Sequence, residues 1–262
     1  VDWSTAYRIA YGVQKNNDEW AYFGYGGNTA VTLDALLAVS QENSQHYGYL
    51  SDGGYHASVT WSDVENITLL GGGYDDVFGY QTGALNSVIA GNGGTDTFFA
   101  DWSSWLEDIT WVNDGTAKTF VHAEVSITVS GVESLLLQTG SGNDFIDNTA
   151  NYTSDEIRTG AGNDTVNAGA GDDQVDGGSG NDMLHGGEGN DTLVGGVGND
   201  IITNTFGYDV IAGGEGSDDI HGGTEEDTLS GDDGNDYLYG DEHDDWLLGG
   251  FGNDYLEGAD GA

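Results

Sequence analysis

The chain has 262 residues, of which 46 are Gly, 46 are Asp or Glu and only four are Lys or Arg. Its formal net charge of −42 excludes a nucleic-acid-binding protein and docking to an anionic membrane, because both need Lys and Arg. Cys is absent, so the sequence can form neither a disulfide framework nor a zinc–thiolate site. No apolar run approaches the roughly 18 residues of a transmembrane helix, which excludes membrane insertion through such a helix.

Residues 1–138 are predicted to form an irregular β-rich region with duplicated units. Residues 58–69 align with residues 126–137, and in both copies a β-rich run leads into a Gly- and Asp-rich segment. The alternation of Val125, Ile127 and Val129 indicates a half-buried strand. The first residues, Val1-Asp2-Trp3-Ser4, resemble the segment that follows one of these Gly/Asp segments. We therefore expect the chain to be part of a longer protein.

Two nine-residue segments within this region share one pattern. Residues 71–79 read GGGYDDVFG and residues 91–99 read GNGGTDTFF, each with Asp at the sixth position, Asp76 and Asp96. They predict short solenoid pieces near 71–99. The full pattern returns at 139–147, TGSGNDFID, with Asp144 in the sixth position, and an eleven-residue variant follows at 148–158.

From residue 159 to residue 257 the sequence divides into consecutive nine-residue units without a gap. Position six is always Asp and position eight is always aliphatic. The Gly-rich positions one to six suit tight turns with positive φ, and positions seven to nine suit a short strand whose middle side chain points inward. Two units then make an 18-residue coil, and successive coils stack as parallel strands about 4.8 Å apart. The predicted fold is all-β, with a parallel β-roll (a β-solenoid) over residues 139–262.

Stacking the coils places the position-six aspartates in a column along each edge. Such columns are repulsive, since two unit charges about 5 Å apart cost roughly 1 kcal/mol even in water. Residues 159–262 contain no Lys or Arg to offset this. The compensating charge must come from outside, and Ca²⁺ tolerates an irregular shell of carboxylate and carbonyl oxygens better than Mg²⁺ does. The candidate metal ligands are Asp76, Asp96, Asp144, Asp164, Asp173, Asp182, Asp191, Asp200, Asp209, Asp218, Asp227, Asp236, Asp245 and Asp254.

The units over 159–257 resemble the RTX (repeats-in-toxin, haemolysin-type) calcium-binding nonapeptide G-G-x-G-x-D-x-U-x. The resemblance implies several Ca²⁺ ions between adjacent turns, held by position-six carboxylates and by carbonyls of positions one to four. The implied turn residues are Gly160, Gly162, Gly169, Gly171, Gly178, Gly180, Gly187, Gly189, Gly196, Gly198, Gly214 and Gly216. Units that depart from the pattern, at Asn204-Thr205-Phe206, Glu225, Asp232, Asp241 and His243, are expected to bind calcium less well or not at all.

The sequence contains no H-E-x-x-H, G-x-S-x-G, P-loop or EF-hand motif, so we expect no enzyme activity. Three functions remain open. The first is a calcium-dependent folding and structural segment of a secreted bacterial surface protein, of adhesin or S-layer type, with a surface glycan or further copies of itself in a lattice as partners. The second is the C-terminal module for type I secretion and folding of a secreted hydrolase whose catalytic domain is absent. The third is a glycan- or protein-binding module that uses the aromatic-rich ends. The internal duplication favours the first, and all three place the chain outside the cell.

Overall fold

The computed structural model describes residues 10–15, 19–24, 46–52, 55–61, 66–70, 77–80, 86–90, 95–113, 118–122, 125–150 and 152–259. Their regular structure is entirely β-strand, which confirms the predicted all-β class. The part of the chain so described has no helix long and apolar enough to cross a membrane. The chain divides into an N-terminal unit, Val1–Asp101 with Gly115–Ser134, and a roll unit, Trp102–Asp114 with Leu135–Ala262. The predicted domain boundary after residue 138 stays a prediction.

The N-terminal unit combines antiparallel hairpins with parallel strand pairs. Strand β1 pairs antiparallel with β2, β3 with β4, and β10 with β11, whereas β7 lies parallel between β5 and β11, and β6 is parallel to β8. The bounds are β1 Ala10–Lys15, β2 Glu19–Gly24, β3 His46–Asp52, β4 Tyr55–Trp61, β5 Asn66–Leu70, β6 Val77–Tyr80, β7 Asn86–Ala90, β8 Thr97–Asp101, β10 Lys118–His122 and β11 Val125–Ser130. The short roll pieces predicted near 71–99 stay a prediction.

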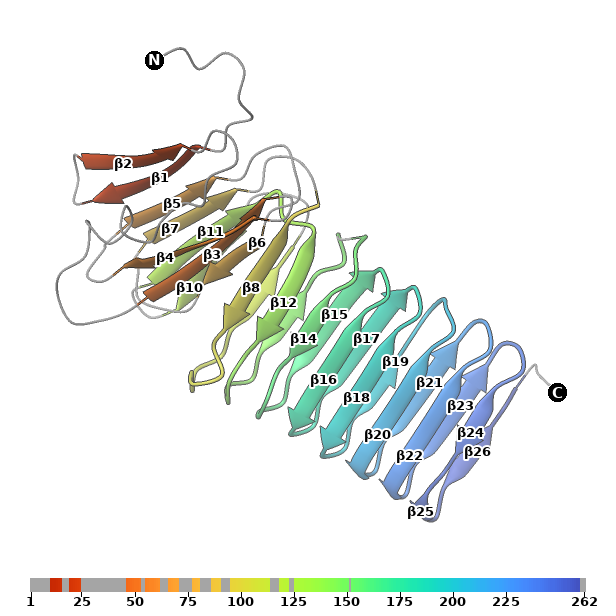
Figure 1. Cartoon of the computed structure of the whole chain (residues 1–262). Coiled ribbons are helices and arrows are strands. Elements are labelled where there is room, and N and C mark those ends of the chain that lie inside the picture. Colours follow the sequence, from red (N-terminus) through yellow and green to blue (C-terminus); the bar gives the residue numbers. More distant parts are fainter. Residues whose placement is uncertain are drawn as a thin grey trace. The chain divides into compact units, whose positions relative to one another are not determined.

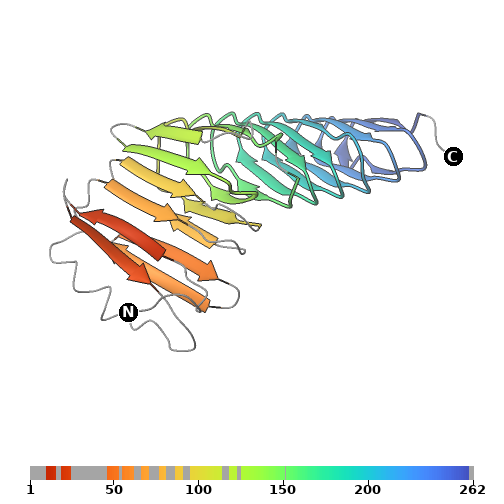
Figure 2. The same cartoon turned by 90° about the horizontal axis from the view of Figure 1, so that it is seen from above.

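The roll unit consists of two parallel sheets that form successive coils (Figure 1). One sheet has the order β24-β22-β20-β18-β16-β14-β12, with β25 beside β22, and the other has the order β26-β23-β21-β19-β17-β15-β13-β9. Figure 2 shows the two sheets as two layers from the green to the blue strands. The bounds are β9 Thr110–Val112, β12 Ser134–Gln138, β13 Phe145–Asp147, β14 Glu156–Arg158, β15 Thr165–Ala170, β16 Gln174–Ser179, β17 Met183–Glu188, β18 Thr192–Val197, β19 Ile201–Thr203, β20 Val210–Gly216, β21 Asp219–Gly223, β22 Thr228–Gly234, β23 Tyr237–Asp241, β24 Trp246–Leu248, β25 Phe251–Gly252 and β26 Tyr255–Glu257.

The strand register follows the nine-residue period. Val175 pairs with Leu193 and Ile211 pairs with Leu229, so neighbouring strands of a sheet are two units apart in the sequence. The eleven-residue unit lengthens the coil locally, because Leu137 pairs with Ile157. The predicted coil of two units, stacked as a parallel β-roll, is confirmed.

The position-eight side chains form one buried row in each sheet. Leu184 and Ile202 are fully buried in one row, and Leu193 is fully buried in the other. Burying such a side chain contributes roughly 1.5–3 kcal/mol. Each coil therefore gains only two large apolar side chains, which is a small core for the length of chain that it orders.

The first coil of the roll unit has a larger core. Trp102 and Trp111 are at most 3% exposed, and Ile109 is also buried. The rings of Trp102 and Trp105 are stacked, with centroids 5.0 Å apart. The apolar core of this coil is therefore built from large aromatic side chains, unlike the small aliphatic core of the regular coils.

Candidate metal sites on the roll edges

The position-six aspartates form two columns, one along each edge of the roll. In each column the backbone N–H of one aspartate donates to Oδ1 of the aspartate one coil further on. The N···O distance is 2.8 Å from Asp164 to Asp182 and 2.8 Å from Asp182 to Asp200. One column holds Asp144, Asp164, Asp182, Asp200, Asp218, Asp236 and Asp254, and the other holds Asp155, Asp173, Asp191, Asp209, Asp227 and Asp245. One oxygen of each carboxylate is thus used to hold adjacent coils together.

Sequence reasoning missed Asp155, which belongs to the second column. Its Oδ1 accepts the N–H of Leu135 at 2.7 Å, and its own N–H donates to Asp173 Oδ1 at 2.7 Å. The sequence did contain a signal for this residue. Asp155 stands two positions before Ile157, as the position-six Asp stands two positions before the position-eight aliphatic residue in a regular unit. The eleven-residue unit therefore preserves the column in spite of its extra length.

A second set of side chains joins the coils at position five, and the sequence analysis did not single it out. Asn181 N donates to Asn163 Oδ1 at 2.7 Å, and Asn199 N donates to Asn181 Oδ1 at 2.7 Å. These side chains are exposed and accept from the following coil, whereas the aspartates accept from the preceding one. The frequency of Asn at position five was the available signal.

The other carboxylate oxygen, Oδ2, is buried and lacks a hydrogen-bond partner in most of the regular coils. This holds for Asp173, Asp182, Asp200, Asp218, Asp227, Asp236 and Asp245. A buried charge without a partner is strongly unfavourable, so the group must either take up a proton or meet a cation. Each column therefore presents a series of unsatisfied oxygens.

Burial raises the pKa of these carboxyl groups. It raises the pKa of Asp173 to about 8 and the pKa of Asp182 and Asp227 to about 7, although the N–H of the preceding coil lowers each in part. Neighbouring carboxylates in the same column add to the rise. Burial likewise raises the pKa of Asp209 and Asp218 to about 6. A cation bound beside these carboxyl groups would stabilise their charged forms and so lower their pKa values.

Where position one of a unit is Gly, it keeps open the space beside Oδ2 of the aspartate in that unit. In the unit of Asp173 this position is Ala168. A Cβ on Gly195 would lie 2.4 Å from Asp200 Oδ2 and 2.6 Å from the carbonyl oxygen of Gly213, in the next coil. A Cβ on Gly177 would meet Asp182 Oδ2 at 2.6 Å and the next carbonyl at 2.8 Å. A carboxylate oxygen and a carbonyl oxygen thus approach the same space from two coils.

The Gly residues at positions two and four of the turns have positive φ. Gly178 has φ 91° and Gly180 has φ 136°, a region that L residues rarely adopt. All twelve predicted turn glycines share this conformation. At the departures, Glu225, Asp232, Asp241 and His243 also adopt φ between 64° and 82°, so the turn backbone is retained there.

These donors fit a hard cation. Among the described residues no three His, Cys, Asp or Glu side chains converge on one point, so a zinc-like side-chain cluster is absent from them. Carboxylate and backbone carbonyl oxygens are the ligands that Ca²⁺ takes, in irregular shells of six to eight. The residues that would hold it are the position-six aspartates and the turn carbonyls, and it would supply the positive charge that the columns lack.

One predicted ligand, Asp96, lies outside the columns. Asp96 belongs to the N-terminal unit, where it is buried and its N–H donates to Glu133 Oε2 at 2.8 Å. Asp76 lies outside the described residues. The ligand roles of these and of the other candidate residues stay predictions.

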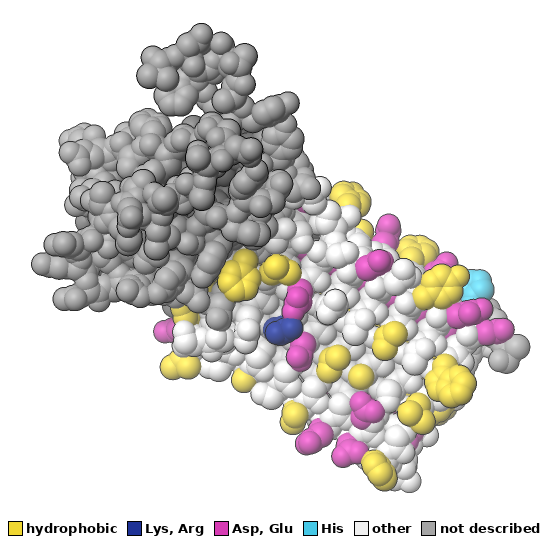
Figure 3. Space-filling model, viewed as in Figure 1, with side chains coloured by type: hydrophobic (Ala, Val, Ile, Leu, Met, Phe, Trp, Pro, Cys, Tyr) yellow, Lys and Arg dark blue, Asp and Glu magenta, His cyan; other side chains and the backbone are white. Residues whose placement is uncertain are grey.

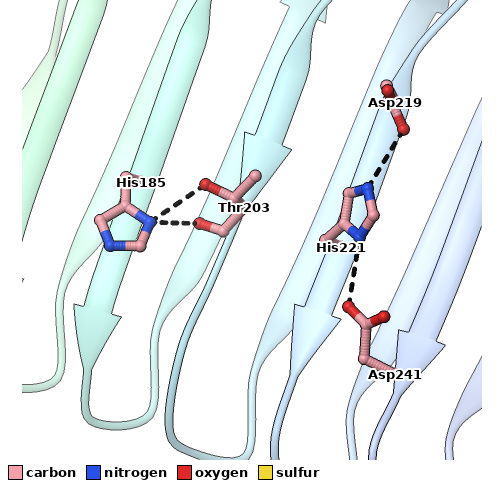
Figure 4. Close-up of polar contacts among 5 residues, drawn as sticks. All are labelled: His185, Thr203, Asp219, His221 and Asp241. Atoms are coloured by element: carbon pink, nitrogen blue, oxygen red, sulfur yellow. Dashed lines mark hydrogen bonds and ion pairs between the residues drawn. The ribbon is translucent and has the colours of Figure 1, made fainter.

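His185 and His221 lie on one sheet of the roll and contact neighbouring strands (Figure 4). His185 Nδ1 lies 3.0 Å from Thr203 Oγ1. His221 lies between two carboxylates, with Nδ1 3.2 Å from Asp241 Oδ2 and Nε2 3.5 Å from Asp219 Oδ1. They bridge neighbouring strands of one sheet.

Comparison with known families supports the assignment of the repeats. The model of the RTX calcium-binding nonapeptide repeat (4 copies) matches residues 149–184, 176–211, 205–229, 212–242, 221–256 and 239–262. The comparison with curated proteins found no match. RTX nonapeptide repeats bind calcium, and this implies a structural calcium-binding role for the segment that carries them. Residues 149–262 therefore carry RTX-type calcium-binding repeats, folded as a parallel β-roll.

Proposed function

We propose that the roll is the calcium-dependent folding and structural segment of a secreted bacterial surface protein, of adhesin or S-layer type, without catalytic activity. The observation that carries the calcium dependence is the series of buried Oδ2 atoms without a hydrogen-bond partner. Without a cation each regular coil combines a small core with buried carboxyl groups that resist ionisation. With Ca²⁺ the free energy of ion binding becomes free energy of folding.

The extracellular setting follows from the same dependence. Extracellular modules often bind Ca²⁺ at about 10⁻⁴–10⁻³ M, so a chain of this kind stays unfolded inside the cell and folds after export. The charge of −42 suits a solvated surface segment that resists aggregation. On the face of the roll in Figure 3, acidic and hydrophobic side chains are interspersed and do not gather into one patch.

The test is a calcium titration of the full chain, prepared calcium-free and followed by circular dichroism and small-angle X-ray scattering. We expect an expanded chain that becomes compact and β-rich with Ca²⁺ and does not respond equally to Mg²⁺. Asp218→Asn, which removes one column charge, should raise the calcium concentration at the midpoint. Asp233→Asn, at an exposed position, should leave the midpoint near that of the wild type. A compact β-rich state in calcium-free buffer, or equal rescue by Mg²⁺, contradicts the proposal.

The surface context is tested separately, by labelling intact and permeabilised source cells with an antibody to the roll. Signal on intact cells supports a surface protein. Signal only in the culture medium, with a catalytic domain in the same polypeptide, would favour the secretion module of a hydrolase instead.

An aromatic cluster on the last coils favours a second function, binding of a glycan. The ring centroids of Tyr237 and Tyr255 are 6.0 Å apart, and those of Tyr239 and Tyr255 are 5.8 Å apart. Tyr237 and Tyr255 are about half exposed, so their faces are open to stacking on a sugar ring. A glycan array probed with the wild type and with Tyr237→Ala tests this, and Phe145→Ala, which is exposed in the same sheet, is the control.

A further inference from the structure

Asp191 differs from Asp173 and Asp227 of its column because both of its carboxylate oxygens have hydrogen-bond partners. Its Oδ1 accepts the N–H of Asp173 at 2.9 Å, and its Oδ2 accepts from Asn204 Nδ2 at 2.9 Å. In Asp173 and Asp227, on the same edge, Oδ2 is buried without a partner. The difference between these coils is the side chain of Asn204.

Asn204 occupies position one of its unit, where the units on either side have Gly. Its side chain is inside the roll, with 8% of the residue exposed. Its Oδ1 accepts the N–H of Gly187 at 2.5 Å and the N–H of Thr205 at 3.0 Å. Both ends of the amide are therefore engaged, which fixes its orientation between the two coils.

The amide lies where other coils have an open space. A Cβ on Gly186 would lie 2.3 Å from Asp191 Oδ2 and 2.8 Å from Asn204 Oδ1. At Gly195 the corresponding neighbours are Asp200 Oδ2 and the carbonyl oxygen of Gly213. The Asn204 side chain thus takes the place of a carbonyl that faces the carboxylate, and its N–H group occupies a lone pair of Oδ2 that a cation would need.

We propose that Asn204 replaces a calcium ion at this coil, so that Asp191 is stabilised by a side-chain amide and does not act as a metal ligand. The residue at position one of the next coil, 13 residues after Asp191, thus decides how this carboxylate is satisfied. Gly leaves Oδ2 open to an ion, and Asn supplies an internal donor. This inference rests on the proposed calcium-dependent function and removes one position from the expected series of ions.

A second Asn at position one shows the same chemistry independently. Asn148, in the eleven-residue unit, is fully buried, and its Nδ2 donates to Asp155 Oδ2. Its Oδ1 accepts from Asn113 Nδ2 at 2.9 Å. Both oxygens of Asp155 are again satisfied by the protein. Here the donor stands at position one of the aspartate's own unit, whereas Asn204 reaches Asp191 from the next coil.

The test counts bound calcium per full chain, by equilibrium dialysis with metal analysis, at saturating Ca²⁺. We expect Asn204→Gly to bind one more ion than the wild type. The control is Asn190→Gly on the same edge, which removes an exposed acceptor of the Tyr208 N–H and should leave the count unchanged. The reverse change, Gly222→Asn, places an amide 13 residues after Asp209, the spacing that separates Asn204 from Asp191, and should remove the ion beside Asp209, whose Oδ2 is buried without a partner.

A stoichiometry of Asn204→Gly equal to that of the wild type, with both chains folded by circular dichroism, overturns the inference. The wild-type count tests the proposed function separately. A wild-type chain that binds no calcium contradicts the proposed function itself. Should a variant fail to fold, an anomalous-difference map of wild-type crystals grown with Ca²⁺ decides. A peak beside Asp191 overturns the inference, and peaks beside Asp182 and Asp200 with none beside Asp191 support it.

Discussion

The first coil of the roll unit and the regular coils after it are stabilised by different means. The first coil buries Trp102 and Trp111, and at the position that pairs with Asp144 it has Ile109. The regular coils bury one aliphatic side chain per strand and place a carboxyl group beside it on each edge. A solenoid coil can thus be stabilised by a large apolar core, or by a small core combined with ligands for an external ion.

The largest expected effect is the response of the calcium-free chain to acid. Burial raises the pKa of Asp173 to about 8 and of Asp182 and Asp227 to about 7, above the usual 3.8. The folded state then binds more protons than the unfolded state between pH 4 and 7. The stabilisation is fully present below about pH 4 and is lost as the pH rises through about 7.

Calcium-free protein should therefore gain β structure when the pH is lowered from 7.5 to 5.5. Circular dichroism of exhaustively dialysed protein at the two pH values measures this. With saturating Ca²⁺ the same pH change should have the opposite sign, because protons compete with the ion. If the calcium-free chain instead became more stable as the pH rises, the column aspartates would not have raised pKa values in the folded state.

The next effect separates the two kinds of coil through their cores. Trp111→Ala should lower the free energy of unfolding in calcium by about 3–5 kcal/mol, since it removes a buried aromatic side chain from the first coil. The number of bound ions should not change. Trp111→Phe, which retains most of the volume, is the matched control. Denaturant titration with calcium counting tests both, and a loss of ions from Trp111→Ala would break the distinction.

A smaller effect is expected from one column residue of the regular coils. Asp182→Ala leaves the buried N–H of Asp164 without its acceptor and should cost about 1–3 kcal/mol in calcium. Asp182→Asn retains an acceptor at Oδ1 and should cost less, while both variants should require more calcium to fold. Equal costs for the two substitutions would mean that the hydrogen bond between coils contributes nothing.

An effect of similar size concerns the space at position one. Gly195→Ala places a Cβ 2.4 Å from Asp200 Oδ2 and 2.6 Å from a carbonyl oxygen, and the strain should cost roughly 1–3 kcal/mol. Gly258→Ala has no heavy atom within 4 Å and should be neutral. Thermal unfolding in calcium compares the two. A neutral Gly195→Ala would show that the space beside the carboxylate is not restricted.

The repeat alone determined most of the architecture. An invariant Asp and an invariant aliphatic position in a nine-residue period require a coil of two units, and parallel stacking then aligns Asp182 with Asp200 and Leu184 with Ile202. The period predicts this because residues at the same position of alternate units lie on the same edge or in the same buried row of the roll. It also predicted the turn conformation at Gly178 and Gly180, since a recurring Gly marks a backbone that other residues adopt with strain.

Only the tertiary structure decided which atoms meet. Spacing does not reveal that Oδ1 of Asp182 accepts the N–H of the preceding coil while Oδ2 turns toward Gly177, because this depends on the rotation of the carboxyl group and on contacts between coils. Nor does it reveal that Asn204 reaches back to Asp191, a residue in another unit of the repeat. In the sequence, Asn204 is only a departure from the Gly expected at position one. In the folded roll, its amide supplies the hydrogen-bond donor that Asp191 Oδ2 would otherwise lack.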